Sequence, residues 1–388
     1  MHIQSTADPL ERSPSHRRRC LPMAALLASL LLGFWQTPSA YTASFIVDST
    51  ADTVDLAPGD GICADLSGSC TIRAAIIETN ALAGPDTITV PAGTYGLSIP
   101  GRLEEASAQG DLDITDSLVV RGAGAPVTIV DGGGLDRVFH MPTVNHVILS
   151  DLTVQNGETD AGDGGGGIFN GQGNQPGGLL ELTNVTVSSN TSTFGGGIIN
   201  GWGARMRLRG VTVSNNTGGA GGGIYTRDGG LVHLTNSTVS NNRALGQAGG
   251  IDAWFNAQVR LVNCTIVQND APFGSGILAE GPNVQVELAA SIIADNSGDA
   301  NCSGVLIVSR GSNLDSDATC SLTQATDLPA TDPALGPLQD NGGPTKTHAL
   351  LPGSPAIDHI DCRVSTDQRG VARPQGPACD VGAYEVRQ

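Results

Sequence analysis

Charged side chains at a regular spacing are the first feature of this chain that could take part in chemistry. They occupy equivalent positions in five similar segments between residues 179 and 289: Glu181, Arg207, His233, Arg260 and Glu287. If these segments are strands stacked at about 4.8 Å, the five side chains form one outward-facing column. Arg207 and Arg260 would then lie about 9.6 Å apart, with His233 between them.

Two interpretations of this column remain open. In the first, it is an exposed ladder in which each Glu pairs with the neighbouring Arg, a contact worth at most about 1 kcal/mol. In the second, Arg207, His233 and Arg260 form a short cationic strip that binds a carboxylate or sulfate group of a glycan. His233 should stay neutral at pH 7, because a positive charge between two arginines is unfavourable.

A second outward column follows a set of glycine-rich segments: Phe169, Ile199, Tyr225, Asp252 and Leu278. Tyr225 and Asp252 are further candidate ligand-binding residues. The Phe169, Ile199 and Tyr225 side chains could stack on sugar rings, and packing beneath a loop is the alternative. The column carries a single carboxylate.

Neither column supplies the paired carboxylates of a glycoside hydrolase, which lie about 5–9.5 Å apart. Glu181 and Glu287 are four coils apart, roughly 19 Å. We find no nucleophile–His–acid triad and no phosphate-binding motif, so we predict no catalytic residue, no metal ligand and no resident cofactor. Calcium at the acidic turns 313–317 and 55–60 is the one exception to test, and hydrogen bonding within Asx turns is the alternative.

The elements that must position these columns follow from an internal repeat of about 26 residues. The isoleucines of the glycine-rich segments illustrate it: Ile168, Ile198, Ile224, Ile251 and Ile277. Each repeat contains three short segments with alternating apolar residues, which predicts three strands per coil. The sequence therefore predicts an all-β fold, a single-stranded right-handed parallel β-helix, with glycines of positive φ at the corners.

A regularly spaced asparagine ends the second segment of each repeat: Asn190, Asn216, Asn242, Asn269 and Asn296. These residues predict a ladder of side-chain amides that bond from coil to coil. An open stack exposes its core and unpaired backbone groups at both ends. Residues 70–83 place Ile72, Ala75, Ile76 and Thr79 on one helical face and predict an N-terminal plug.

The repeat ends near residue 320. Residues 321–388 are rich in Pro and Gly and predict an irregular C-terminal cap. The predicted divisions are a signal peptide at 1–40, an N-terminal cap at 41–96, the β-helix at 97–320 and the C-terminal cap at 321–388.

The N-terminus and the cysteines predict export. Three arginines at 17–19 precede an apolar run at 21–35, which is typical of a signal peptide; an uncleaved anchor is the alternative, and no other stretch could span a bilayer. Neighbouring cysteines suggest three disulfides, although spacing alone does not fix connectivity: Cys63–Cys70, Cys302–Cys320 and Cys362–Cys379. Cys264 lies in an apolar strand and is expected to be a buried, inert thiol.

The net charge is −18 and the chain has a single lysine, Lys346. Proteins that neutralise phosphates carry clustered Lys and Arg, so nucleic acid and anionic membranes are unsuitable partners. The remaining candidates are an extracellular polysaccharide or a surface protein.

Three parts of the chain resemble known families. Residues 45–88 are similar to the N-terminal domain of CSLREA-domain proteins, with CTIRAA at 70–75 in place of CSLREA, where Ile72 replaces Leu and Ala74 replaces Glu. NGGPTKTHALLPGSPAID (341–358) and TDQRGVARPQGPACDVGAYE (366–385) resemble the choice-of-anchor Q domain, and the GGGI repeats resemble those of polymorphic outer-membrane proteins. These resemblances imply a secreted or surface-displayed bacterial β-helix of the pectin-lyase type, but no reaction. Because the sequence stops at Gln388, we expect a released or non-covalently held protein.

Three hypotheses follow. The first is a non-catalytic secreted or cell-surface β-helix that binds glycan, matrix or another cell. The second is a polysaccharide lyase or glycoside hydrolase, in which carboxylate and base side chains converge in a groove. The third is a structural component of the cell envelope that associates with itself.

Overall fold

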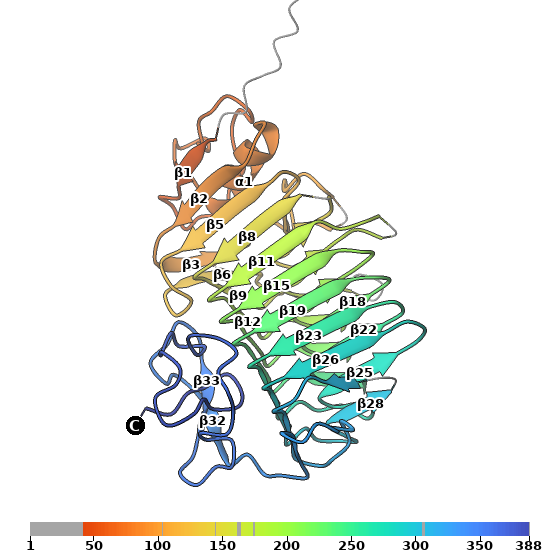
Figure 1. The fold of residues 1–388 in the computed structure, drawn as a ribbon. Helices are drawn as coiled ribbons and strands as arrows, with labels where there is room; N and C mark the ends of the chain where they lie inside the picture. Colours follow the sequence, from red (N-terminus) through yellow and green to blue (C-terminus); the bar gives the residue numbers. More distant parts are fainter. Residues whose placement is uncertain are drawn as a thin grey trace, which may run out of the picture. The chain divides into compact units, whose positions relative to one another are not determined.

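The fold is built from strands that pair with the strand one coil later in the sequence (Figure 1). The computed structural model describes residues 42–387 except 103, 144, 161–163, 174 and 305–306, so the predicted signal peptide at 1–40 lies outside the described residues. Three sheets run along the stack, and all their strand pairs are parallel. The predicted parallel β-helix is therefore confirmed.

Sheet A contains ten strands in this spatial order: β1 (Ser44–Ile46), β2 (Asp86–Val90), β5 (Leu118–Gly122), β8 (His146–Ser150), β11 (Leu179–Thr183), β15 (Arg205–Arg209), β19 (Leu231–Thr235), β23 (Gln258–Val262), β26 (Gln285–Ala289) and β29 (Ile307–Ser309). Sheet B also contains ten: β3 (Gly93–Gly96), β6 (Thr128–Asp131), β9 (Thr153–Gln155), β12 (Thr186–Ser188), β16 (Thr212–Ser214), β20 (Thr238–Ser240), β24 (Thr265–Val267), β27 (Ile292–Ala294), β30 (Leu314–Asp315) and β31 (Leu328–Pro329).

Sheet C contains eight strands: β4 (Leu112–Asp113), β7 (Phe139–Met141), β10 (Ile168–Asn170), β14 (Ile198–Asn200), β18 (Ile224–Arg227), β22 (Ile251–Trp254), β25 (Ile277–Glu280) and β28 (Cys302–Gly304). A short fourth sheet consists of β13 (Thr191–Phe194), β17 (Thr217–Ala220) and β21 (Arg243–Gln247). The remaining elements are helix α1 (Ile72–Ala81) and the antiparallel pair β32 (Leu335–Gln339) and β33 (Thr347–Leu350).

The core is the stack of inward-facing columns that the repeat predicted. Ile198, Ile224 and Ile251 are paired in register on neighbouring strands of sheet C and are fully buried. Glycine is required beside them because the coils approach closely: a Cβ on Gly196 would lie 2.4 Å from the carbonyl oxygen of Thr217. The repeat therefore keeps glycine where two coils come close together, as well as apolar residues in the core.

Glycine occupies fewer corners than the sequence suggested. Gly195 and Gly221 have φ values of 59° and 63° at the corner before sheet C. The corner between sheets A and B places Asn184 and Asn236 in the left-handed region instead, at 55° and 48°. Asparagine tolerates this conformation because its short polar side chain can bond locally.

The asparagine ladder is present at the corner after sheet B. Asn216 Nδ2 donates to Asn242 Oδ1 at 2.9 Å, and Asn242 Nδ2 donates to Asn269 Oδ1 at 3.0 Å. Each amide also bonds to backbone: Asn242 Nδ2 donates to the carbonyl of Val213, and its Oδ1 accepts the backbone N–H of Asn216. These side chains are fully buried, so the ladder satisfies polar groups that water cannot reach.

The N-terminal plug is helix α1, as predicted. Its apolar face buries Ile72, Ala75 and Ile76 against the first coils. The helix also buries two charged residues that the apolar pattern did not reveal, Arg73 and Glu78. Glu78 accepts the backbone N–H groups of the loop at 59–61, and Arg73 pairs with a carboxylate, so both charges are compensated.

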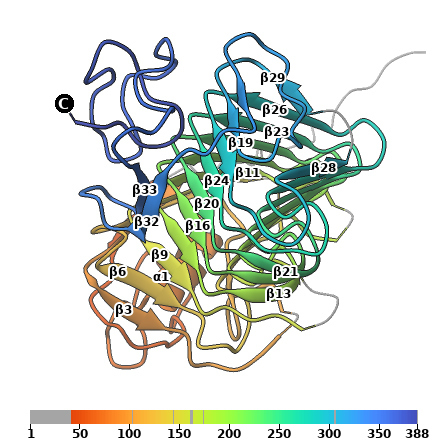
Figure 2. The same cartoon turned by 90° about the horizontal axis from the view of Figure 1, so that it is seen from below.

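The C-terminal segment lies along the flank of sheet B, where β32 and β33 run beside β16, β20 and β24 (Figure 2). The sequence predicted a cap over the end of the stack, whereas the structure places this segment against the outer face of sheet B, which presents hydroxyl groups together with apolar side chains such as Ile292 and Leu314. Thr212 Oγ1 donates to the carbonyl of Lys346, and Thr238 Oγ1 donates to Gln368 Oε1, both at 2.7 Å. The segment therefore covers this face of sheet B through hydrogen bonds and through an apolar cluster that includes Val267, Ile292 and Leu350.

Three disulfides join the cysteine pairs that the sequence suggested: Cys63–Cys70, Cys302–Cys320 and Cys362–Cys379. Cys264 is a free, fully buried thiol. Within the described part of the chain, no helix has the length and apolar character required to cross a membrane.

Replacement of Asn242 by Ala should lower the free energy of unfolding by on the order of 2–4 kcal/mol. The substitution leaves the buried carbonyl of Val213 and the N–H of Asn216 without partners. Urea unfolding measures the effect, with Gln285→Ala on the exposed face of β26 as the control, expected within about 0.5 kcal/mol of wild type. Equal effects of the two substitutions would show that the ladder adds no stability.

Cys264 should not react with a thiol reagent while the protein is folded. Burial keeps the reagent away from the sulfur atom. It also raises the pKa of the thiol to about 12, so the reactive thiolate does not form. An aromatic disulfide reagent should detect no thiol in folded protein that comprises residues 41–388, and one thiol per chain after this protein is unfolded without reductant. Reaction of the folded protein at the rate of a small free thiol would contradict this placement.

Candidate functional site

The predicted charged column lies on the outer face of sheet A. Glu181, Arg207, His233, Arg260 and Glu287 follow one another in register on β11, β15, β19, β23 and β26. These strands lie side by side along the stack (Figure 1). A shallow groove of about 410 Å³ runs over β15, β19, β23 and β26 and is lined by Arg205, Arg207, His233, Arg260 and Glu287, among others.

The ion pairs of this column differ from the predicted ladder at one end. Glu181 contacts Arg207 at 3.2 Å, as predicted, and also His146 Nε2 at 3.3 Å. Glu287 instead pairs with Arg310, which follows β29, at 2.5 Å. The prediction that Glu287 pairs with Arg260 is therefore wrong, because the next coil supplies a nearer guanidinium. Arg260 makes no ion pair within 4 Å among the described residues.

His233 occupies the centre of the strip. Burial lowers the pKa of its imidazole, and the guanidinium groups of Arg260, Arg207 and Arg209 lower it further. The direction agrees with the expectation that His233 is neutral at pH 7. A neutral imidazole can donate one hydrogen bond and accept another.

Three further arginines, Arg205, Arg209 and Arg310, enlarge the strip, and the sequence analysis did not include them. Strand β15 has the sequence Arg-Met-Arg-Leu-Arg, and its alternation exposes Arg205, Arg207 and Arg209 on one face. That alternating pattern was visible in the sequence. With Arg260 and Arg310, this face carries five guanidinium groups against the carboxylates of Glu181 and Glu287.

Tyr225 and Asp252, the other two candidate ligand-binding residues, lie on sheet C instead of sheet A. They are in register on β18 and β22, but Tyr225 is 6% exposed and Asp252 is fully buried. Phe194 of the fourth sheet stacks on Tyr225, with ring centroids 5.6 Å apart. The structure thus places these residues in packing contacts beneath the fourth sheet, apart from the arginine strip.

Asp252 is an unusual buried group. Its Oδ2 accepts a hydrogen bond from Gln247 at 3.2 Å, and its Oδ1 has no hydrogen-bond partner in the described structure. Burial raises the pKa of this carboxyl group to about 7. The group therefore disfavours the folded state once it is ionised.

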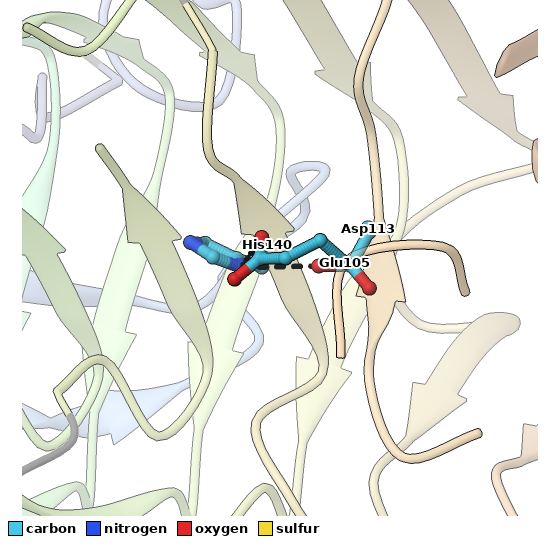
Figure 3. Close-up of side chains that lie close together, drawn as sticks. All are labelled: Glu105, Asp113 and His140. Carbon is cyan, nitrogen blue, oxygen red and sulfur yellow. Dashed lines mark hydrogen bonds and ion pairs between the residues drawn. The ribbon is translucent and has the colours of Figure 1, made fainter. Parts of the chain in front are cut away.

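A second polar cluster, which the sequence analysis missed, lies at the N-terminal end of sheet C. Glu105, Asp113 and His140 bring one ligand atom each to within 4.8 Å of one another (Figure 3). His140 Nδ1 lies 3.0 Å from Asp113 Oδ1 and 3.3 Å from Glu105 Oε2. Asp113 and His140 are in register on β4 and β7, and Phe169 follows them in the same column.

The surroundings of this cluster hold its imidazole firmly. The ring of His140 stacks on Phe169 with centroids 5.1 Å apart, and its Nε2 lies 3.0 Å from the carbonyl oxygen of Gly171. Arg137 lies nearby and contacts Asp111 at 2.7 Å. Burial lowers the pKa of His140 and raises that of Asp113. In the absence of a compensating cation, these shifts disfavour the imidazolium form of His140 and the carboxylate form of Asp113.

The acidic turns considered for calcium are occupied by internal hydrogen bonds. Asp315 accepts the backbone N–H of Cys320 and the amide of Asn301, and Asp317 accepts the N–H groups of Asn301 and Thr319. In the turn at 55–60, Asp55 accepts the N–H groups of residues 57 and 64. The bonds from Thr319 to Asp317 and from residue 57 to Asp55 span two residues, which is the geometry of Asx turns.

Comparison with known proteins bears on the fold. The sequence model of the family described as "Right handed beta helix region" matches residues 138–319, in agreement with the predicted handedness. No curated protein matches the sequence. Pectate lyase Pel9A is a similar solved structure, at 15% identity and a TM-score of 0.40, covering 90% of this chain and 97% of that chain. The A-module of mannuronan C-5 epimerase AlgE6 from Azotobacter vinelandii is 14% identical, with a TM-score of 0.22, covering 63% and 94%. The central coils are thus similar to right-handed β-helices, and the two enzymes carry no argument about activity.

Asp252 should make the stability of the protein depend on pH. Its folded pKa of about 7 is above the unfolded value of roughly 3.9, so the folded chain retains a proton that the unfolded chain loses. The free energy of unfolding should therefore fall as the pH rises from about 4 to 7. Between pH 5 and pH 8, the wild type should lose on the order of 2 kcal/mol more than Asp252→Asn.

Urea unfolding at the two pH values measures this difference. Glu158→Gln, which neutralises an exposed carboxylate, is the control and should follow the wild type. Parallel pH profiles for the wild type and Asp252→Asn would contradict the role of Asp252.

Proposed function

We propose that this protein acts outside the cell as a non-catalytic β-helix that binds an acidic polysaccharide on the outer face of sheet A. The observation that carries the proposal is the arginine-lined groove on a chain whose net charge is −18. A cationic strip is unexpected on such a protein unless it has an anionic partner.

The charge of the strip supports an anionic ligand. Arg207 shares Glu181 with His146, whereas Arg205, Arg209 and Arg260 make no ion pair within 4 Å among the described residues. Guanidinium groups bind carboxylates and sulfates through two parallel hydrogen bonds, which gives directional recognition. The acidic remainder of the surface repels polyanions at long range, so binding would depend on close contact with this groove.

The spacing of the strip supports an extended ligand. The strands repeat at about 4.8 Å, which places Arg207 and Arg260 about 9.6 Å apart across His233. A chain with regularly spaced acidic groups, such as a polyuronate or a sulfated glycan, could engage both guanidinium groups at once. The backbone beneath them is fixed by the sheet, so binding orders side chains only.

The carboxylates of the groove support binding without cleavage. Glycoside hydrolysis requires two carboxyl groups about 5–9.5 Å apart, and Glu181 and Glu287 are separated by four strand spacings, roughly 19 Å. Each of them also pairs with an arginine, and the hydrogen bond from Arg310 lowers the pKa of Glu287, which makes Glu287 unsuited to the role of general acid.

An extracellular location is part of the proposal. The disulfides Cys63–Cys70, Cys302–Cys320 and Cys362–Cys379 are typical of proteins that mature in an oxidising compartment. The apolar run at residues 21–35, preceded by arginines, supports export.

Replacement of Arg260 by Ala should weaken binding to a polyuronate or a sulfated glycan by about tenfold, because a charge-assisted hydrogen bond is lost. Arg243→Ala is the matched control, since it removes the same charge from an exposed side chain on the fourth sheet. Calorimetric titration measures both affinities, and wild-type binding should weaken as salt is added.

Three results would contradict the proposal. Equal losses in Arg260→Ala and Arg243→Ala would show that net charge, and not the groove, controls binding. Tight binding of a neutral glucan would exclude an acidic ligand. New chain ends released from any polysaccharide during long incubation with the wild type would show that the protein is an enzyme.

A further inference from the structure

We propose that Glu105, Asp113 and His140 form a binding site for a first-row divalent transition metal ion such as Zn²⁺. The site lies on sheet C and its adjoining loop, so it is independent of the proposed polysaccharide groove. The three ligand atoms would be Glu105 Oε2, Asp113 Oδ1 and His140 Nδ1 (Figure 3).

The tautomer of His140 is the first argument. Its Nε2 lies 3.0 Å from the carbonyl oxygen of Gly171, which can only accept a hydrogen bond, so Nε2 carries the proton. In the neutral ring, Nδ1 then presents a lone pair to Asp113 Oδ1 and Glu105 Oε2, at 3.0 and 3.3 Å. Three electron-pair donors that face one another are stable only with a cation or a proton between them.

The second argument is that each candidate ligand is held by its other polar atom. His140 Nε2 donates to Gly171, Asp113 Oδ2 accepts the backbone N–H of Ser107, and Glu105 Oε1 accepts Gln172 Nε2 at 2.8 Å. Metal ligands in proteins are commonly oriented by such outer hydrogen bonds, and a histidine that donates to a carbonyl is a frequent case. The arrangement leaves one inward-facing atom on every side chain.

The local charge is the third argument. Glu104, Glu105, Asp111, Asp113 and Asp136 lie around the cluster, and Arg137 is the guanidinium that acts on Asp113 and His140. Asp113 is fully buried and His140 is 4% exposed, so solvent would compensate little of the negative charge that these carboxyl groups carry when they are ionised. A dication between the three ligand atoms would offset it.

The geometry and ligand types identify the class of cation. Ligand atoms around a tetrahedral Zn²⁺, with bonds of about 2.0–2.1 Å, are separated by roughly 3.4 Å, and His140 Nδ1 lies 3.0 and 3.3 Å from the two carboxylate oxygens. An imidazole nitrogen favours Zn²⁺ and its neighbours over Ca²⁺ and Mg²⁺, which prefer oxygen ligands. The Glu105 side chain is 44% exposed, so the fourth position would open to solvent and hold water.

Glu105→Gln tests the site without disturbing the core, because Glu105 is on an exposed loop and Gln can still accept from Gln172. The wild-type mature protein, first stripped with a chelator, should bind Zn²⁺ in a calorimetric titration. Glu105→Gln should weaken this binding at least ~10-fold. The matched control is Glu280→Gln, an exposed carboxylate at the end of β25, which should leave Zn²⁺ affinity unchanged.

Nitrogen NMR of the histidine rings gives a second readout. Zn²⁺ should shift Nδ1 of His140 to a metal-bound value while Nε2 stays protonated, and Ca²⁺ should leave both unchanged. Equal Zn²⁺ affinity in the wild type and Glu105→Gln would overturn the proposal. So would a His140 Nδ1 whose resonance stays unchanged in excess Zn²⁺, or a preference of this site for Ca²⁺.

Discussion

Hydrogen bonding between backbone segments one coil apart is the interaction on which the rest of this structure depends. It aligns residues 26 or 27 positions apart, as in the register of Arg207, His233 and Arg260. Glycines such as Gly196 allow the coils to approach, and the buried amide ladder through Asn242 fixes their register. Because inward columns form the core, functional groups are confined to outward columns and to the loops between strands.

The N-terminal cap links closure of the stack to the geometry of the acidic cluster. The buried guanidinium of Arg73 pairs with Asp52 at 2.6 Å and donates to the backbone carbonyls of Ser107, Gly110 and Asp111. A buried charge of this kind must be fully compensated, so the loop at 104–111 is held in one conformation. That loop carries Glu105 and leads directly into β4. The helix that covers the core thus also positions the cluster.

The two candidate sites have opposite charge and lie on different sheets. Sheet A gathers guanidinium groups on β15 and β23, on either side of β19, whereas the N-terminal end of sheet C gathers carboxylates around His140. The arginines are exposed and form a surface suited to an extended anionic ligand. The cluster is mostly buried. Electrostatic attraction is stronger in such a low-dielectric environment, so a cation would be bound firmly. The exposed site is therefore suited to an extended anionic ligand, and the buried site to a cation.

The sequence by itself determined the coil, the columns and the amide ladder, because a repeat places equivalent residues at equivalent heights in a stack. The sequence did not determine which segments pack against each outward-facing column of side chains. Tyr225 and Asp252 are buried because the fourth sheet packs over them, and Glu287 pairs with Arg310 because the next strand of sheet A, β29, brings Arg310 beside it. The cluster around His140 joins coils spaced by 27 and 29 residues to a loop outside the repeat. Only the tertiary structure brings such segments together, because their contacts depend on the conformation of a loop. A repeat pattern in the sequence does not predict that conformation.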